Sequence, residues 1–180
     1  MLEFKTPQIE DKAWVDQCFK HLKTMNCDYT FGNMFVWSTE YSTKICRFKD
    51  FFICSWGKGK ETNFGIPVGS GDFKEAVEEV IKYAKANDIT PRFYGVTEAY
   101  VEMLNENFPD AFQFLYDESY GDYIYEVEKM ASLKGKKYHG KRNHITNFKK
   151  NNPNWSFETI NKDNIDDCIN LHAKWINTHV

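Results

Sequence analysis

The segment Leu133–Lys150, which reads LKGKKYHGKRNHITNFKK, holds the densest group of side chains that could bind an anion. Eight Lys or Arg residues and no acid lie between Lys129 and Lys150, whereas the stretch before it, Gly95–Glu128, has nine acids and no Lys or Arg. A planar guanidinium and several ammonium groups suit phosphate oxygens. A solvated helix that joins two units, with its charges facing water, would have the same composition. The residues alone leave both interpretations open.

Two glycines interrupt the basic segment and support the binding interpretation. Gly135 and Gly140 are poor residues for a purely structural helix, and they would let the backbone approach a ligand closely. We expect the surrounding cations to hold phosphate groups, and one His and one Asn to add neutral hydrogen bonds. These candidate ligands are Lys136, Lys137, His139, Lys141, Arg142 and Asn143.

A second candidate anion site lies at the turn Ile66–Asp72, which reads IPVGSGD. Gly69 and Gly71 stand just ahead of an expected helix, so they could present backbone N–H groups to an anion at the helix N-terminus. The pattern is neither GxGxxG nor a P-loop. A tight turn that needs a positive φ explains the two glycines more simply.

The remaining residues indicate no metal site and no standard catalytic motif. His139 and His144 are five residues apart, not the three or four that one helix face requires for a shared metal ion. The five cysteines have no CxxC spacing, and neither HExxH nor GxSxG occurs. No general base can be named. We expect reduced thiols and a cytoplasmic protein, because no signal peptide and no run of about 20 apolar residues is visible.

Length and composition predict one ordinary soluble domain, or one such domain plus part of another. The chain has 180 residues, of which 42% are hydrophobic and 27% charged. A net charge of −3 argues against a globally basic nucleic-acid binder.

The expected elements mix hairpins with crossover helices, which predicts an α/β (α+β) fold with a mixed, mainly antiparallel sheet covered by helices. The strands are expected at Lys44–Phe48, Phe51–Trp56, Phe64–Val68, Pro91–Val96, Phe112–Tyr116, Asp122–Val127 and Trp155–Ile160, with Phe112–Tyr116 and Asp122–Val127 as a pair. The helices are expected from Thr6-Pro7 (Thr as N-cap), in Tyr29–Trp37, Asp72–Asn87, Thr97–Asn107 and Leu133–Lys150, and from Asp163 onward.

Four segments in order resemble the bacterial proteins that share the C-terminal domain of phosphatidylglycerol lysyltransferase. They read YTFGNMFVW, IPVGSGD, DYIYEVE and LKGKKYHGKRNHITNF, and the last is the most specific. The resemblance implies two acyltransferase-like halves of the N-acetyltransferase (GNAT) type. It also implies a phosphate-bearing acyl donor, either a coenzyme A thioester or aminoacyl-tRNA, because the best-known branch moves lysine from lysyl-tRNA to a lipid headgroup. Pro67-Val68 stands where acetyltransferases carry Arg or Gln before their glycines, which counts against coenzyme A.

The resemblance also predicts how the chain is divided. Residues 1–130 would form the first acyltransferase-like half, and residues 131–180 the basic linking helix with an incomplete start of the second half. Such a fragment would pack its later apolar side chains on the first half or on a second copy, or leave them partly exposed. The intact protein would be an acyl- or aminoacyltransferase, with tRNA as a candidate partner. The alternative is a non-catalytic binding or structural module with the same fold.

Overall fold

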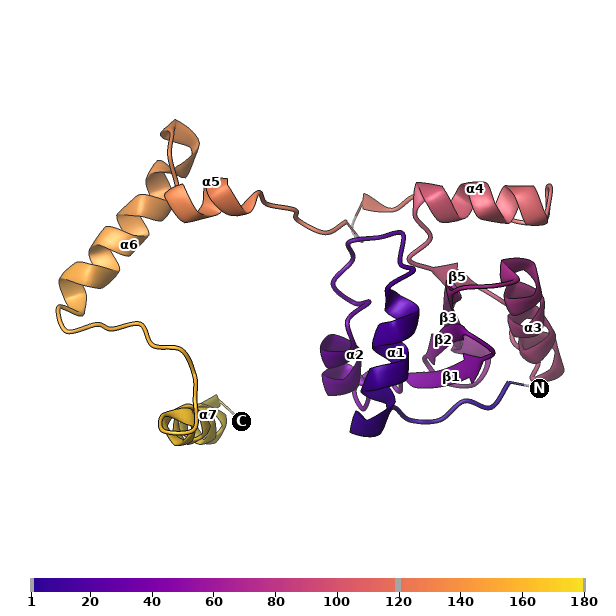
Figure 1. Ribbon diagram of the computed structural model, residues 1–180, viewed down its shortest axis with the longest axis horizontal. Helices are drawn as coiled ribbons and strands as arrows, with labels where there is room; N and C mark the ends of the chain where they lie inside the picture. Colours follow the sequence, from indigo (N-terminus) through magenta and orange to yellow (C-terminus); the bar gives the residue numbers. More distant parts are fainter. Residues whose placement is uncertain (1, 119–120, 180) are drawn as a thin grey trace. The chain divides into compact units, whose positions relative to one another are not determined.

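The computed structural model describes residues 2–118 and 121–179, and it divides into two compact units, Met1–Asp122 and Tyr123–Val180 (Figure 1). The first unit holds a mixed sheet with helices on both faces. The second consists of helices and extended connections in the part of it that the structure describes. The chain therefore has the mixed α+β architecture that the order of elements predicts.

A mainly antiparallel sheet forms the centre of the first unit. Its strands are β1 (Lys44–Phe48), β2 (Phe51–Trp56), β3 (Asn63–Gly65), β4 (Val68–Gly69) and β5 (Phe93–Tyr94). The order is β1-β2-β3-β5, and β4 pairs with β2. Every pairing is antiparallel except that between β3 and β5, which is parallel because α3 crosses over between them. The predicted mixed, mainly antiparallel sheet is confirmed.

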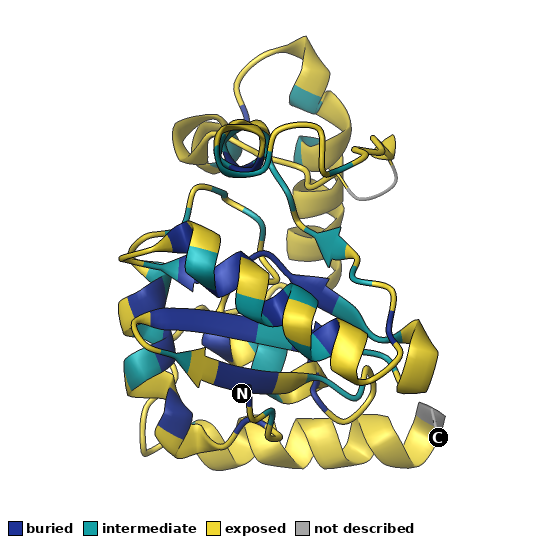
Figure 2. Cartoon of the chain, turned by 90° about the vertical axis from the view of Figure 1, so that its right-hand side faces the viewer, coloured by how far each residue is buried: buried dark blue, intermediate teal, exposed yellow. Residues whose placement is uncertain are grey.

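Strand alternation sends side chains of β1 and β2 to two different cores. Ile45 and Phe52 pack with Val15 of α1 (Lys12–Phe19) on one face. On the other face, Ile53 packs with Val80 of α3 (Phe73–Ala86). Figure 1 shows α1 and α3 on opposite sides of the sheet. The buried residues are concentrated in the first unit (Figure 2).

The remaining helices of this unit are short. They are α2 (Phe31–Trp37), α4 (Glu98–Asn107) and the 3-10 turns η1 (Ile9–Asp11) and η2 (Gly59–Glu61). Tyr100 and Leu104 of α4 are buried in the same core as Phe73 of α3. Asp72 caps α3, since its Oδ1 accepts from the Glu75 N–H at 2.9 Å. The Glu75 carboxylate pairs with Lys49.

The prediction that Thr6-Pro7 opens the first helix is wrong. Lys5 and Ile45 exchange backbone hydrogen bonds of 2.9 and 2.8 Å, which hold the chain extended beside β1. A residue before proline also favours extended backbone. The helical turn therefore begins later, at η1 with Gln8 as its N-cap, and α1 follows.

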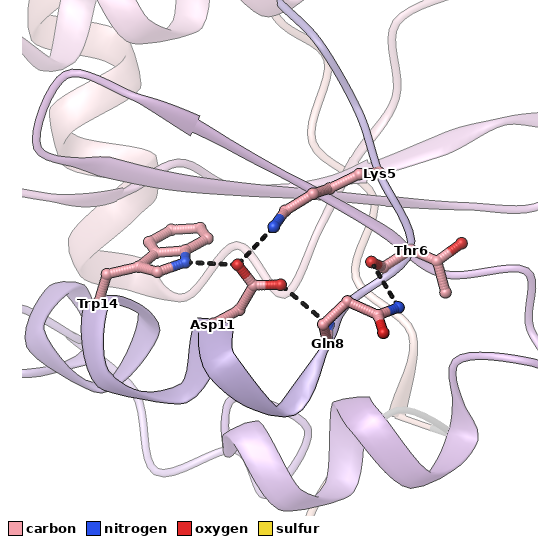
Figure 3. Close-up of polar contacts among 5 residues, drawn as sticks. All are labelled: Lys5, Thr6, Gln8, Asp11 and Trp14. Atoms are coloured by element: carbon pink, nitrogen blue, oxygen red, sulfur yellow. Dashed lines mark hydrogen bonds and ion pairs between the residues drawn. The ribbon is translucent and has the colours of Figure 1, made fainter.

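The buried carboxylate of Asp11 holds the chain in place where η1 and α1 begin (Figure 3). Asp11 is only 4% exposed, and its carboxylate accepts from Lys5 Nζ at 2.6 Å, Trp14 Nε1 at 2.8 Å and the Gln8 N–H at 2.9 Å. Burial by itself would raise the pKa of Asp11, but these hydrogen bonds outweigh it and hold that pKa below its ordinary value. The ionised side chain therefore ties the N-terminal segment to α1.

The predicted strand pair Phe112–Tyr116 with Asp122–Val127 does not form. Neither segment pairs with any strand in the described ranges, and Val127 instead begins helix α5 (Val127–Ser132). Alternation of apolar side chains makes a strand only where another strand can accept its backbone hydrogen bonds. The side chain of Tyr123 is 89% exposed as a result. Trp155–Ile160, also predicted as a strand, is irregular too.

The second unit has very little buried apolar surface. Its elements are α5, the 3-10 turn η4 (Lys136–Tyr138), α6 (His139–Asn151) and α7 (Ile165–His179). Leu133 is the one buried side chain among those described in it. Large apolar side chains stay exposed, among them Trp155, Ile165, Ile169 and Trp175. These elements do not form a packed core of their own, and the predicted self-association through them stays a prediction.

Candidate anion-binding site

The basic segment begins with a sharp turn between two helices. α5 ends at Ser132. Its C-cap Leu133 has a left-handed φ of +47°, and Gly135 follows with a φ of +98°. No atom lies within 4 Å of where a Cβ of Gly135 would be, so the residue is needed for its backbone conformation and not for space. The chain then passes through η4 into α6, which carries most of the predicted ligands.

Arg142 of α6 holds this turn in place. Its Nη1 donates to the Leu133 carbonyl and, at 2.8 Å, to the Gly135 carbonyl. Within the described part of the chain, its remaining guanidinium nitrogens have no hydrogen-bonding partner. Nη1 of the guanidinium is thus occupied by backbone carbonyls, while the positive charge and the N–H donors of Nε and Nη2 stay available to a ligand. The residue composition does not reveal this positioning role.

The lysines of the segment are free cations. Lys136, Lys137 and Lys141 are exposed, and no described Asp or Glu lies within 4.0 Å of their ammonium groups. Lys137 Nζ lies 6.0 Å from the centre of the Tyr138 ring, a weak contact at an exposed site. Elsewhere in the described residues six lysines pair with acids, for example Lys60 with Asp88. The charges between 136 and 141 are left for solvent or for an anionic ligand.

The two neutral candidates contact each other. His139 Nε2 and Asn143 Nδ2 are 3.2 Å apart, at i and i+4 on α6. If the Asn143 amide donates, Nε2 is the acceptor and Nδ1 carries the proton, which leaves one imidazole donor for a ligand. Gly140 lies between them in the helix with nothing within 4 Å of its Cβ position, and nothing in the structure explains why this position is glycine.

Gly69 and Gly71 belong to the other unit, where the fold itself accounts for both. A Cβ on Gly69 would lie 2.1 Å from the Asp50 carbonyl oxygen, because β4 pairs with β2 there, with Gly69 opposite Phe51. Gly71 has a φ of +112°, the conformation that the simpler interpretation of the turn requires.

A small cavity of about 60 Å³ nevertheless opens at this turn. Both glycines line it together with the cationic Lys23, the imidazole of His21 and the buried Tyr100. The Tyr100 hydroxyl accepts from the Lys23 N–H at 3.4 Å, and burial raises the pKa of Tyr100. Sequence reasoning did not find Lys23 and Tyr100, because 77 residues separate them and only the fold brings them together.

The other side chains whose pKa is shifted do not suggest a nucleophile. Burial raises the pKa of the Cys54 thiol to about 12, so the reactive thiolate is almost absent at neutral pH. Burial likewise raises the pKa of Tyr29 and of Cys18. Among the side chains that the structure describes, no group of three His, Cys, Asp or Glu could hold a metal ion. The charges and hydrogen-bond donors of the basic segment are of the kind that suits an anion, and anion binding there stays a prediction.

Comparisons with known proteins place the chain in a family. The sequence model for "Phosphatidylglycerol lysyltransferase, C-terminal" matches residues 19–180. A crystal structure of a conserved protein of unknown function from Bacteroides thetaiotaomicron is similar over 99% of this chain, with 31% identity and a TM-score of 0.83. The match covers 60% of that protein, so this chain spans less than two thirds of its length. A comparison with curated proteins found no match. No described helix is long and apolar enough to cross a membrane.

Proposed function

The chain belongs to the family of the phosphatidylglycerol lysyltransferase C-terminal domain, and we propose that it is part of an acyl- or aminoacyltransferase whose donor carries phosphate groups. In this proposal the first unit is an acyltransferase-like half of the GNAT type. The observation that carries the proposal is the set of unpaired lysines between 136 and 141, on a turn that Arg142 holds in shape.

The basic segment would bind the donor through its phosphates. Lys136, Lys137 and Lys141 supply point charges, and the free donors of Arg142 and His139 supply directed hydrogen bonds. Aminoacyl-tRNA suits this surface better than coenzyme A, because several cations on η4 and α6 suit a ligand that carries many phosphates. Catalysis would then consist mainly of positioning, with backbone N–H groups polarising the acyl carbonyl as it becomes tetrahedral.

One observation favours a non-catalytic module instead. Arg142, the best phosphate ligand by residue type, uses its Nη1 to hold two backbone carbonyls, which is an architectural role. In that case the basic helix would join two units, with its charges facing water.

Direct binding separates the two functions. Fluorescently labelled tRNA would be titrated with the protein, and coenzyme A would be titrated in a calorimeter, with the wild type and with a Lys136→Gln, Lys137→Gln, Lys141→Gln variant. The transferase proposal predicts binding of the wild type to a phosphate ligand, tRNA above all, and strong loss in the variant. Absence of binding to both ligands, or equal binding by both proteins, would favour the module.

A further inference from the structure

A polar groove runs beside α1 in the first unit, and neither the proposed function nor the fold requires it. Its volume is about 550 Å³, which is within the range of small-molecule sites. It lies between α1, the β1–β2 turn and the turn ahead of α3. The side chains that line it and matter for recognition are Trp14, Gln17, His21, Arg47, Asp50 and Ser70.

The aromatic wall of the groove is rigidly held. Trp14 Nε1 donates to the buried Asp11 carboxylate at 2.8 Å (Figure 3), and its ring packs against Phe52 with 6.0 Å between ring centres. The Arg47 guanidinium lies 5.8 Å from the centre of the same ring. A wall fixed in this way needs no ordering when a ligand binds, which favours recognition.

Arg47 and Asp50 place opposite charges next to each other in this groove. Arg47 Nε donates to the Lys49 carbonyl at 3.1 Å, which orients the guanidinium, and the Cys18 thiol donates to the Asp50 carbonyl at 3.5 Å. The Arg47 Nη2 and Asp50 Oδ1 atoms are 3.7 Å apart, too far for a hydrogen bond. Both side chains are mostly exposed, at 55% and 74%. Apart from the Trp14 ring beside Arg47, neither ionic group has another side-chain partner in the described part of the structure.

This pair of charges selects the ligand. The Asp50 carboxylate repels a phosphate or any other polyanion, and it attracts an ammonium group. The Arg47 guanidinium binds a carboxylate well. An α-amino acid carries both groups on one carbon atom, so it can satisfy both residues at once. The indole of Trp14 offers apolar surface beside them for an aliphatic side chain.

We propose that this groove binds a free α-amino acid as its zwitterion, with the carboxylate on Arg47 and the ammonium group on Asp50. The site is confined to the first unit, so it stands independently of the basic segment. Because both charges are more than half exposed, solvent screens them, and binding is expected to be weak and salt-sensitive.

The test uses ligands that each lack one of the two charges. The ¹⁵N-labelled protein would be titrated with L-leucine, N-acetyl-L-leucine and L-leucine amide, following the indole N–H signal of Trp14, which a Trp14→Phe variant assigns. L-leucine should shift this signal and bind at least about tenfold more tightly than either derivative. Arg47→Gln and Asp50→Asn should each weaken L-leucine binding by about tenfold or more.

Arg92→Gln is the matched control, because Arg92 is equally exposed and lies 4.0 Å from Glu61 outside the groove. It should leave L-leucine binding unchanged. Equal binding of N-acetyl-L-leucine to the wild type would overturn the zwitterion proposal in favour of a simple anion site. No shift with L-leucine up to its solubility limit would overturn it altogether. These ligand comparisons on the wild type hold even where a variant misfolds.

Discussion

Replacing Asp11 by Ala should destabilise the first unit more than any exposed acid does. The change removes a buried acceptor and leaves the Trp14 indole N–H and the Gln8 N–H without a partner. Each unsatisfied donor costs about 1–3 kcal/mol, and the half-buried indole regains some water. Lys5 is mostly exposed, so loss of its ion pair adds little. We therefore expect the free energy of unfolding to fall by roughly 2–4 kcal/mol at neutral pH.

The pH dependence gives this prediction a specific sign. The pKa of Asp11 is lowered in the folded state, so its contribution is present above the unfolded-state pKa and is lost as pH falls through the folded-state value. The difference in unfolding free energy between wild type and Asp11→Ala should be constant from about pH 7 to pH 5 and shrink below about pH 4.

Urea denaturation followed by tryptophan fluorescence at several pH values measures both quantities. Asp16→Ala is the control, because Asp16 pairs with Lys12 on the exposed side of α1 and should cost less than about 0.5 kcal/mol. The account of the Asp11 cluster would be refuted if both variants were equally stable, or if the Asp11→Ala difference persisted unchanged down to pH 2.

The other predictions concern the turn, the basic segment and the thiols. Gly69→Ala should lower the thermal midpoint, since its Cβ would meet the Asp50 carbonyl at 2.1 Å; an unchanged midpoint would mean that the β2–β4 pairing is looser than described. Arg142→Lys should speed hydrogen exchange of the amides around 135–138, because a single ammonium cannot reproduce the fork on two carbonyls, while the global unfolding midpoint stays constant. Cys54, with its pKa raised to about 12, should react far more slowly with a thiol reagent at pH 8 than the exposed Cys168, as mass spectrometry after brief labelling would show.

Local signals in the sequence were sufficient for the centre of the first unit. The bounds of β1 and β2 agree with the expected strands, because Lys49-Asp50 makes a tight turn and apolar residues run on both sides of it. The expected helix Asp72–Asn87 forms as α3, in which the Asp72 cap and the buried apolar face belong to the same element. In both places, local propensity and burial agree.

The wrong predictions lie where backbone pairing between segments far apart in the sequence determines the secondary structure. Nothing near Thr6 indicates that Lys5 bonds to Ile45, so a good helix-start pattern was misleading. Apolar and polar side chains do alternate in Asp122–Val127, but no strand in the described structure pairs with this segment.

The candidate site shows the same limit. The basic residues and their glycines can be read from the sequence, whereas the hydrogen bonds of Arg142 depend on a left-handed turn at Leu133 that no composition indicates. The cavity at Gly69 and Gly71 needs α4, which follows much later in the chain.

The salt dependence of ligand binding tests the central claim most directly. The affinity for a single-stranded oligonucleotide, as a simple phosphate probe, would be measured from low to high salt. If Lys136, Lys137, Lys141 and Arg142 each neutralise one phosphate, log K should fall with log salt with a slope of about −3. Changing the three lysines to Gln should make the slope shallower by about 2 units. The control changes Lys12, Lys60 and Lys82, which pair with acids, and should leave the slope unchanged. Equal slopes for all three proteins would contradict a phosphate-binding role for the segment.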